Sequence, residues 1–318
     1  MNPSLPLPMR DGVSPSRTVL PRGSWPTILH CLIERFPQVA AAEWLRRVAL
    51  GEVVDTEGVA ITATRPHEPG LTVFYYRTIM TEPRIPFEEC LLFQDEHLVV
   101  VDKPHFLPVM PAGRFLHETL LVRLKRKLAN DSLVPIHRID RGTAGVVLFC
   151  ANLTSRGAYQ ALFRERTVEK TYEAIAPYNE ALKLPMLYES RLVPDEHFTR
   201  MREVEGEPNA QTRIELIERL DGDRADAVAA PGAIAHYRLS PTTGRKHQLR
   251  VQCAALSIPI LNDPIYPVLL AEHAAGSPDE YSKPLQLLAR SVSFQDPMTG
   301  EQRSFSSNRE LQCASTPL

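Results

Sequence analysis

The sequence has few cysteines, and none of them is arranged to bind a metal or to build a disulfide framework. The five cysteines are scattered, odd in number and never in a C-x-x-C pair. This pattern predicts reduced thiols in a cytoplasmic protein and argues against structural zinc. The ten histidines are equally dispersed, and the chain has no glycine-rich phosphate loop or dinucleotide fingerprint. We therefore expect neither a metal nor a cofactor.

Long apolar runs are also absent. No stretch approaches the roughly 20 apolar residues that a membrane helix needs, so no membrane partner is expected. The first 22 residues contain five prolines and the charged residues Arg10, Asp11 and Arg17, without the apolar core of a secretory signal. Residues 1–22 are therefore predicted to form a flexible arm, and the protein is expected to stay in the cytoplasm.

The chain has no large excess of charge of either sign, because the net charge of its 318 residues is −2. This balance does not indicate a uniformly basic surface, so any polyanion would have to be bound by local clusters. One such cluster lies at a predicted helix, residues 114–127, which contains a single acid, Glu118. Its five basic residues are Arg114, Arg123, Lys125, Arg126 and Lys127. A second basic stretch, which contains no acid, holds Arg238, Arg245, Lys246 and Arg250. Such a cluster is either a solvated face or a contact for phosphates.

The sequence does contain a polar cluster that runs directly into a strand-like apolar segment. Residues 137–145 read His-Arg-Ile-Asp-Arg-Gly-Thr-Ala-Gly, and Val-Val-Leu-Phe follows. A single carboxylate, Asp140, lies between Arg138 and Arg141. Such a group is either a fixed, ionised nucleophile or a turn or cap residue paired with a neighbouring cation. These residues alone leave both interpretations open.

A turn-rich segment at residues 81–86 divides the chain into a small module, residues 23–80, and a larger domain. Apolar spacing predicts two helices and then two short strands before this segment, at residues 25–36, 41–50, 51–55 and 71–76. Strand-like runs after it lie at residues 98–102, 145–151, 167–176, 211–220, 233–239 and 285–294. Helical spacing after it lies at residues 116–128, 157–166 and 247–256.

These elements do not alternate regularly between strand and helix. The larger domain, residues 87–310, is therefore predicted to be α+β, with a mixed, largely antiparallel sheet rather than a doubly wound one. Residues 311–318 are predicted to form a tail.

Four segments occur in the order of the motifs that define the RluA-type RNA pseudouridine synthases. Residues 93–104 resemble the opening strand D-x-x-hydrophobic-K-P, and residues 137–148 resemble H-R-L-D-x-x-T-S-G-L-L-L. Residues 169–174 are similar to K-x-Y-x-A, and residues 243–251 to T-G-R-x-H-Q-L-R. The resemblance implies the pseudouridine synthase fold, a bent sheet flanked by helices with the active cleft between its two parts. The small module resembles the αL-type RNA-binding module that often precedes such domains.

The resemblance also implies an activity, the isomerisation of a specific uridine in transfer or ribosomal RNA on a flipped-out nucleotide. Asp140 would be the nucleophile, Arg250 the cation paired with it, and Tyr172 the ring against the uracil; Arg245 is the alternative cation. The other residues expected to bind structured RNA are His137, Arg138, Lys103, Lys170 and Arg245, with the basic helix at residues 114–127. Two of these residues have an alternative, structural role: His137 could support the turn through hydrogen bonds, and Lys103 could stabilise the end of its strand. We expect a monomer.

The resemblance has departures. Ile139 and Ala144 replace the usual Leu and Ser, and His105-Phe106 stands where small residues and Gly usually follow the lysine and proline. Residues 262–267, Asn-Asp-Pro-Ile-Tyr-Pro, replace G-D-x-x-Y-G. These departures concern loops that could carry substrate specificity. Two other functions also stay under consideration, a catalytically inactive RNA-binding protein and an N-glycosylase that uses the same carboxylate but releases the base.

Overall fold

The computed structural model describes residues 6–77, 82–197, 199–220, 233–270 and 281–312. The chain divides into two compact units, one of residues 1–83 and 111–131 and the other of residues 84–110 and 132–318. The structure thus groups residues 111–131 with the smaller unit, whereas the sequence placed them in the larger domain.

The smaller unit combines helices with a three-stranded antiparallel sheet of order β1-β3-β2. Its elements are β1 (Ser16–Val19), α1 (Ile28–Arg35), α2 (Ala41–Ala49), β2 (Val53–Val54), β3 (Thr72–Tyr75) and α3 (Leu120–Leu128). The predicted helix–helix–strand–strand order is confirmed. The prediction of a flexible arm is wrong for residues 16–19, because they form β1 and pair with β3.

Local sequence explains these elements. Thr27 precedes α1 and its hydroxyl accepts a hydrogen bond from the His30 amide at 3.3 Å, which caps the helix. Thr119 caps α3 in the same way. The fully buried Trp44 of α2 meets Tyr75 of β3 edge to face, with ring centroids 5.1 Å apart. The unit therefore has its own apolar core between helices and sheet.

The larger unit is built on one mixed sheet. Its strands are β4 (Cys90–Gln94), β5 (Leu98–Lys103), β6 (Val134–Pro135), β7 (Ala144–Cys150), β8 (Glu169–Pro177), β9 (Met186–Pro194), β10 (Met201–Val204), β11 (Ala210–Leu220), β12 (Ile234–Pro241), β13 (Leu287–Gln295) and β14 (Gln302–Ser306). The main order is β10-β9-β11-β12-β8-β13-β7-β5-β4, with β14 on β13 and β6 on β7. Only β13 and β7 pair in parallel among the described strands. The predicted mixed, largely antiparallel sheet is confirmed.

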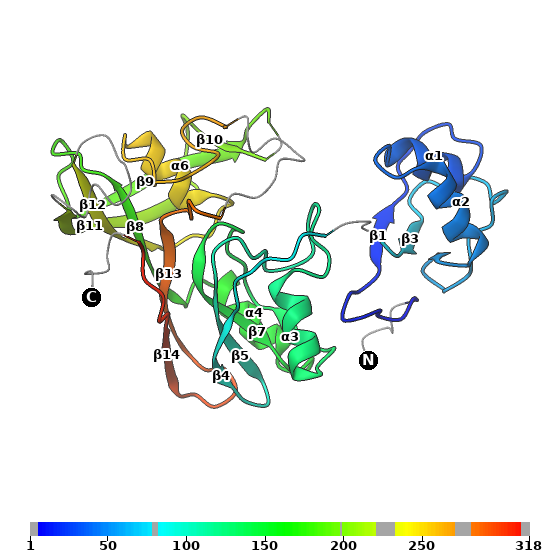
Figure 1. Cartoon of the computed structure of the whole chain (residues 1–318), viewed down its shortest axis with the longest axis horizontal. Helices are drawn as coiled ribbons and strands as arrows, with labels where there is room; N and C mark the ends of the chain where they lie inside the picture. The colour runs from blue at the N-terminus through cyan, green and yellow to red at the C-terminus, as the bar shows by residue number, and fades with distance from the viewer. Residues whose placement is uncertain (1–5, 78–81, 198, 221–232, 271–280, 313–318) are drawn as a thin grey trace. The chain divides into compact units, whose positions relative to one another are not determined.

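Among the described residues of this unit, the helices that cover the sheet are α4 (Arg156–Arg164) and α6 (Gln248–Ala255). Figure 1 shows β9 to β12 with α6 in one part of the unit and β4, β5, β7 and β14 with α4 in the other, while β13 runs between them. Leu249 and Cys253 of α6 pack into an apolar cluster with residues of β8, β11 and β12. This packing fixes the start of α6 beside β8.

The parallel contact between β7 and β13 requires a glycine. All seven residues of β7 are buried, as expected for a strand covered on both faces. Gly145 has φ +110°, and a Cβ atom there would lie 2.2 Å from the Ala289 carbonyl oxygen. A side chain at this position would force the two strands apart. Gly145 thus keeps β13 close to the segment that follows Asp140.

Candidate active site

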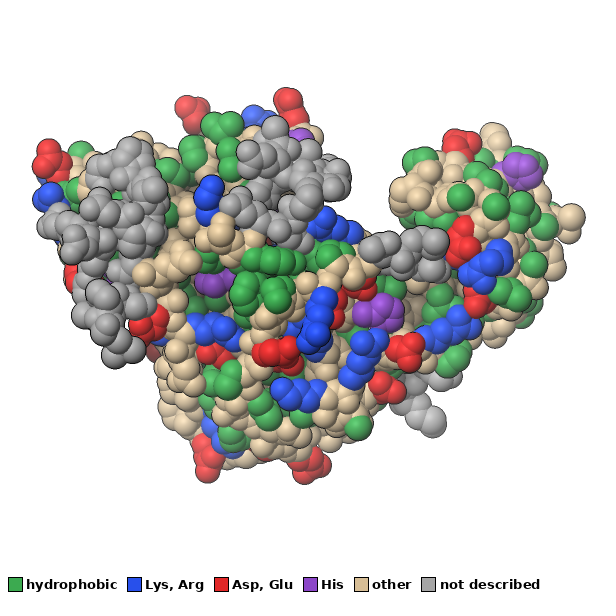
Figure 2. Space-filling model, in the orientation of Figure 1, with side chains coloured by type: hydrophobic (Ala, Val, Ile, Leu, Met, Phe, Trp, Pro, Cys, Tyr) green, Lys and Arg blue, Asp and Glu red, His purple; other side chains and the backbone are tan. Residues whose placement is uncertain are grey.

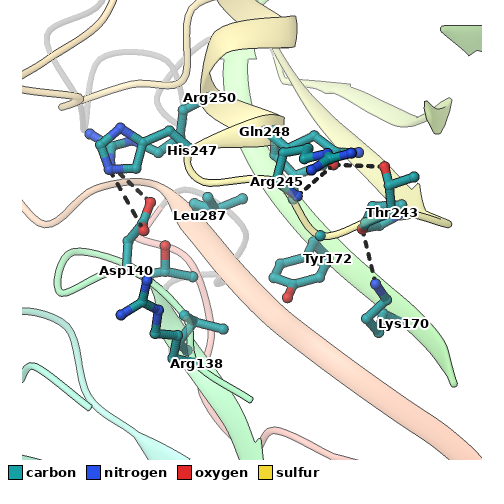
Figure 3. A pocket seen from close by; sticks show the side chains of 15 residues that line it. Arg138, Asp140, Lys170, Tyr172, Thr243, Arg245, His247, Gln248, Arg250 and Leu287 are labelled. Atoms are coloured by element: carbon teal, nitrogen blue, oxygen red, sulfur yellow. Dashed lines mark hydrogen bonds and ion pairs between the residues drawn. The ribbon is translucent and has the colours of Figure 1, made fainter. Parts of the chain in front are cut away.

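A pocket of about 110 Å³ lies where several segments of the larger unit meet. It is lined by the loop before β7, by β8, by the turn after β12, by the start of α6 and by Leu287 of β13. Figure 3 shows Asp140 and Arg138 on one side, Lys170 and Thr243 on the other, and Tyr172 between them. Pockets for drug-sized ligands measure roughly 300–1,000 Å³. This one therefore suits a single small ring.

The carboxylate of Asp140 is fixed from the side of α6. Its Oδ2 accepts a hydrogen bond from Arg250 Nη1 at 2.9 Å, and its Oδ1 lies 3.8 Å from His247 Nε2. Burial raises the pKa of Asp140, but the charge and hydrogen bond of Arg250 outweigh this effect, so the pKa lies below its ordinary value of 3.8. The side chain is still 29% exposed. Asp140 is therefore ionised at neutral pH, fixed in direction and accessible.

Arg250 is shared by two carboxylates. Its Nε and Nη2 donate to Asp263 Oδ2 and Oδ1, both at 2.7 Å, which leaves Nη1 for Asp140. The side chains of Arg250 and Asp263 are only 5% and 1% exposed. Burial lowers the pKa of Arg250, but the hydrogen bonds and charge of Asp263 raise it above its ordinary value. Arg250 is thus the partner of Asp140, whereas Arg245 donates to the Asn209 carbonyl at 3.1 Å.

Asp263 is a site residue that the sequence did not reveal. It also accepts hydrogen bonds from the amides of Ile265 and Tyr266 at 2.8 and 3.1 Å, so it organises the turn that carries it. The only sequence signal was the segment at residues 262–267, which departs from the family motif G-D-x-x-Y-G. The same turn places the hydroxyl of Tyr266 2.9 Å from His247 Nδ1.

Strand β8 contributes Lys170 and Tyr172, two residues apart and hence on one face of the strand. Burial, followed by the charge of Asp140, raises the pKa of Tyr172, so its hydroxyl stays protonated. Lys170 Nζ donates to the Thr243 carbonyl at 3.0 Å, and burial lowers the pKa of Lys170 to about 8. The pocket thus combines an aromatic ring with a lysine that titrates near physiological pH.

Neutral side chains tie the turn after β12 to α6. The Oε1 atom of Gln248 accepts from Thr243 Oγ1 at 2.7 Å and from the Arg245 amide at 3.1 Å. Its Nε2 donates to Thr212 Oγ1 at 2.9 Å. These bonds fix one wall of the pocket. The role of Gln248 was not predicted from the sequence, in which its place in the fourth motif was the only signal.

Two expected RNA contacts have structural roles instead. The Lys103 side chain is fully buried, and its Nζ lies 2.9 Å from the Pro104 carbonyl oxygen, so the predicted phosphate contact is wrong. His137 Nε2 accepts from the Leu148 amide at 3.1 Å, and its ring stacks on Phe163 with centroids 4.6 Å apart. Burial lowers the pKa of His137 to about 3. The turn-supporting alternative therefore describes His137 better than an RNA contact.

The basic helix α3 is not one uniform phosphate-binding face. Lys125 is 5% exposed, and Arg123 forms an ion pair with an acid of the preceding turn. Arg114 lies outside α3, which begins only at Leu120, and is half-buried, with its guanidinium carbon 5.3 Å from the centre of a neighbouring phenylalanine ring. The exposed members are Arg126 and Lys127. Figure 2 likewise shows Lys and Arg interspersed with Asp and Glu on the face that it presents.

Within the described ranges, no three or more His, Cys, Asp and Glu side chains are grouped so that they could hold a metal ion. The same ranges contain no helix with the length and apolar character needed to span a bilayer. The side chains of this pocket accordingly offer a carboxylate, cations, a phenol and amides to a substrate.

Comparison with known proteins agrees with this geometry. Residues 97–255 match the family described as RNA pseudouridylate synthase. The chain is 30% identical over 228 residues to the dual-specificity RNA pseudouridine synthase RluA of Haemophilus influenzae, which covers 70% of this chain and 93% of that protein. It is 27% identical over 234 residues to the tRNA pseudouridine(31) synthase of Saccharomyces cerevisiae, or 67% of this chain and 55% of that protein.

A solved structure, human RNA pseudouridylate synthase domain containing 1, has a TM-score of 0.55 and 19% identity, and covers 72% of this chain and 86% of that one. This likeness shows the fold. The match to the family and the identity to RluA show more, because residues 97–255 include every residue that lines the pocket except Leu287, and the similarity to RluA spans 70% of this chain. The chain therefore belongs to the RluA-type RNA pseudouridine synthase family and is an isomerase that converts uridine in RNA to pseudouridine.

Proposed function

We propose that this chain isomerises a specific uridine in transfer or ribosomal RNA, with Asp140 as the nucleophile on a flipped-out nucleotide. The observation that carries this proposal is the hydrogen-bonded pair of Asp140 and Arg250 beside a pocket of single-ring size. An ionised, fixed and accessible carboxylate meets the requirements of covalent catalysis. Tyr172, in the same pocket, offers a surface on which an extruded uracil can stack.

The reaction breaks the bond between ribose C1′ and uracil N1 and forms a bond between C1′ and C5. Asp140 traps the electron-poor ribose or the base while the detached uracil turns within the pocket. C5 then loses a proton and N1 gains one, so the composition of the RNA is unchanged and nothing is oxidised. A pocket that excludes water protects the detached state from hydrolysis.

Other residues contribute to RNA binding in this proposal. Arg138 is exposed at the pocket, and its planar guanidinium can fill the stack that a flipped nucleotide leaves. Arg245 and Lys170 line the same pocket and can contact phosphates. Arg126 and Lys127 are the exposed basic residues of α3.

The small N-terminal module is a further RNA contact in this proposal, because its helix–helix–strand–strand order resembles an αL-type module. The choice of transfer or ribosomal RNA rests on relatives, since the yeast relative is named for tRNA. A cytoplasmic monomer stays a prediction.

Product analysis tests the proposed function. RNA from cells that lack this protein should gain pseudouridine at a defined uridine on incubation with the purified chain, with no change in RNA mass. An N-glycosylase would instead release free base and lower the mass, and an inactive binding protein would leave every uridine unchanged. Either result contradicts the proposal. RNA incubated without the protein is the control.

Activity should be lost only at acidic pH. The pKa of Asp140 lies below 3.8, so the carboxylate stays charged throughout the neutral range and is neutralised only as the pH falls through that lowered value. His247, with a pKa of about 4, gains its proton in the same acidic range. The single-turnover rate constant at saturating RNA should therefore be nearly flat from roughly pH 5 to 8.

The pH series is run in excess chelator, with folding checked at each pH. Saturating RNA is needed because Lys170, with a pKa of about 8, titrates at the alkaline end and is expected to affect RNA affinity. An inflection near neutrality in the rate constant would assign the essential charge to another group. Loss of activity on chelation, with RNA structure intact, would contradict the expected absence of a metal.

A further inference from the structure

The last residue of β5 and the segment that follows it hold the loop that carries Asp140. Lys103 Nζ lies 3.2 Å from the Arg141 carbonyl oxygen, and Arg141 Nε donates to the Phe106 carbonyl at 2.9 Å. His105 Nδ1 lies 2.7 Å from the Gly142 carbonyl oxygen. Three hydrogen bonds thus connect residues 103–106 to the two residues directly after Asp140. Residues 105 and 106 are also the place where the sequence departs from the family's small residues and Gly.

His105 acts here as a hydrogen-bond donor. The Gly142 carbonyl can only accept, so Nδ1 must carry the hydrogen. Burial lowers the pKa of His105 to about 4, against the raising effect of this bond, so the ring is neutral at physiological pH. Protonation would leave the Nδ1 donor in place. The contact therefore persists across the pH range in which Asp140 is ionised.

Phe106 presents its carbonyl through an unusual backbone conformation. Its φ is +66°, the left-handed region that a bulky side chain seldom adopts unless its surroundings hold it there. The Phe106 ring stacks on Phe87 with centroids 5.8 Å apart and meets Tyr281 edge to face at 5.2 Å. These rings hold Phe106 in place, and its carbonyl thereby stays directed at Arg141.

We propose that His105 is a positioning residue that, together with Phe106, fixes the backbone after Asp140 and so sets the aim of the carboxylate. Arg250 holds the Asp140 side chain from α6, and His105 holds the main chain from the end of β5. Residues 140–143 form a turn that is closed by the Thr143 amide, which donates to the Asp140 carbonyl at 3.2 Å. This inference rests on the proposed role of Asp140 and assigns a task to a position at which the motif departs from its family.

The test compares His105→Leu, which removes the donor, with His105→Asn, whose side-chain amide can donate from nearly the same place. In His105→Leu, the single-turnover rate constant at saturating RNA should fall about 10- to 100-fold, the range expected when a reacting group is slightly misplaced. The affinity for the RNA that the wild-type protein converts should be unchanged. His105→Asn should recover most of the rate. The control is His97→Leu, which changes a half-buried histidine next to the other end of β5.

Amide hydrogen exchange gives a readout that does not need activity. Exchange at residues 140–144 should accelerate in His105→Leu but not in His105→Asn or His97→Leu, because only the first loses the bond to Gly142. If the wild-type chain makes no pseudouridine yet this pattern is seen, the proposed function fails and the positioning contact stands. If His105→Leu does not fold, His105→Gln, whose amide lies one bond further out, takes its place.

Three results would overturn the proposal. The first is a wild-type rate in His105→Leu, and the second is an equal loss in His105→Asn, which would make the hydrogen bond irrelevant. The third is weakened RNA affinity at an unchanged rate, which would turn His105 into an RNA contact.

Discussion

Asp140→Asn should abolish pseudouridine formation while RNA binding survives. The amide has nearly the shape of the carboxylate, but it is neutral and cannot trap an electron-poor carbon. Losing a covalent nucleophile lowers turnover by about 10⁴-fold or more in well-studied enzymes. Tritium release from RNA labelled at C5 of uridine measures the reaction, and a filter or gel assay measures binding.

The matched control is Asp131→Asn, which changes an exposed aspartate of the same chain. This variant should keep wild-type turnover. Appreciable turnover by Asp140→Asn would remove Asp140 from its proposed role. Loss of RNA binding in the same variant would show that the carboxylate instead has a structural role in forming the binding surface.

Arg250→Met should lower both stability and activity. The substitution leaves Asp263, whose side chain is 1% exposed, without its bidentate partner, and breaking such a buried pair costs about 3–5 kcal/mol of unfolding free energy. The pKa of Asp140 should rise, because the charge that lowers it is gone while burial stays. The acidic inflection of the rate should therefore move to higher pH. At neutral pH the rate constant should fall by about 10²-fold or more.

Two further variants keep this prediction testable if Arg250→Met unfolds. Adding Asp263→Asn removes the uncompensated carboxylate, so the double variant should be more stable than Arg250→Met in urea unfolding, but still slow. Arg250→Lys keeps the charge and loses the planar fork, so its stability and rate should lie between those of wild type and Arg250→Met. Wild-type activity with an unshifted pH profile in Arg250→Met would show that Arg250 does not set the charge state of Asp140.

Sequence alone predicted the strands that are buried on both faces. β7 is a continuous apolar run and β5 begins with four apolar residues, and the structure buries every residue of both strands. β4, β9 and β14 were not predicted. Partly or fully exposed positions dominate all three strands, and in β9 and β14 polar residues also interrupt the apolar pattern. The position of residues 111–131 was not predictable either, because it depends on which apolar surface the amphipathic helix α3 covers.

The motifs predicted which residues come together at the site. They did not predict which contacts hold those residues in place. Asp140, Tyr172 and Arg250 do line one pocket, although their catalytic roles stay predictions. Asp263 holds Arg250 of α6 only because the turn at residues 262–267 folds back onto that helix, and no local sequence pattern predicts this contact. The prediction that Lys103 contacts phosphate failed for a related reason. Lysine is rarely buried unless its charge finds partners. Here the partners are backbone carbonyls, which are invisible in a sequence.

Side chains of β8 alternate between the two faces of the sheet, and this alternation restricts which insertions and deletions the enzyme can accept. Lys170 and Tyr172 face the pocket, whereas Glu173 lies 2.7 Å from Arg290 and 3.3 Å from His236 in a buried ionic cluster. Inserting or deleting one residue upstream in this strand would exchange the two faces, with an acid in the pocket and a phenol among charges. We therefore expect the length of β8 to be fixed during evolution, so that changes of target RNA arise in the loops and in the N-terminal module.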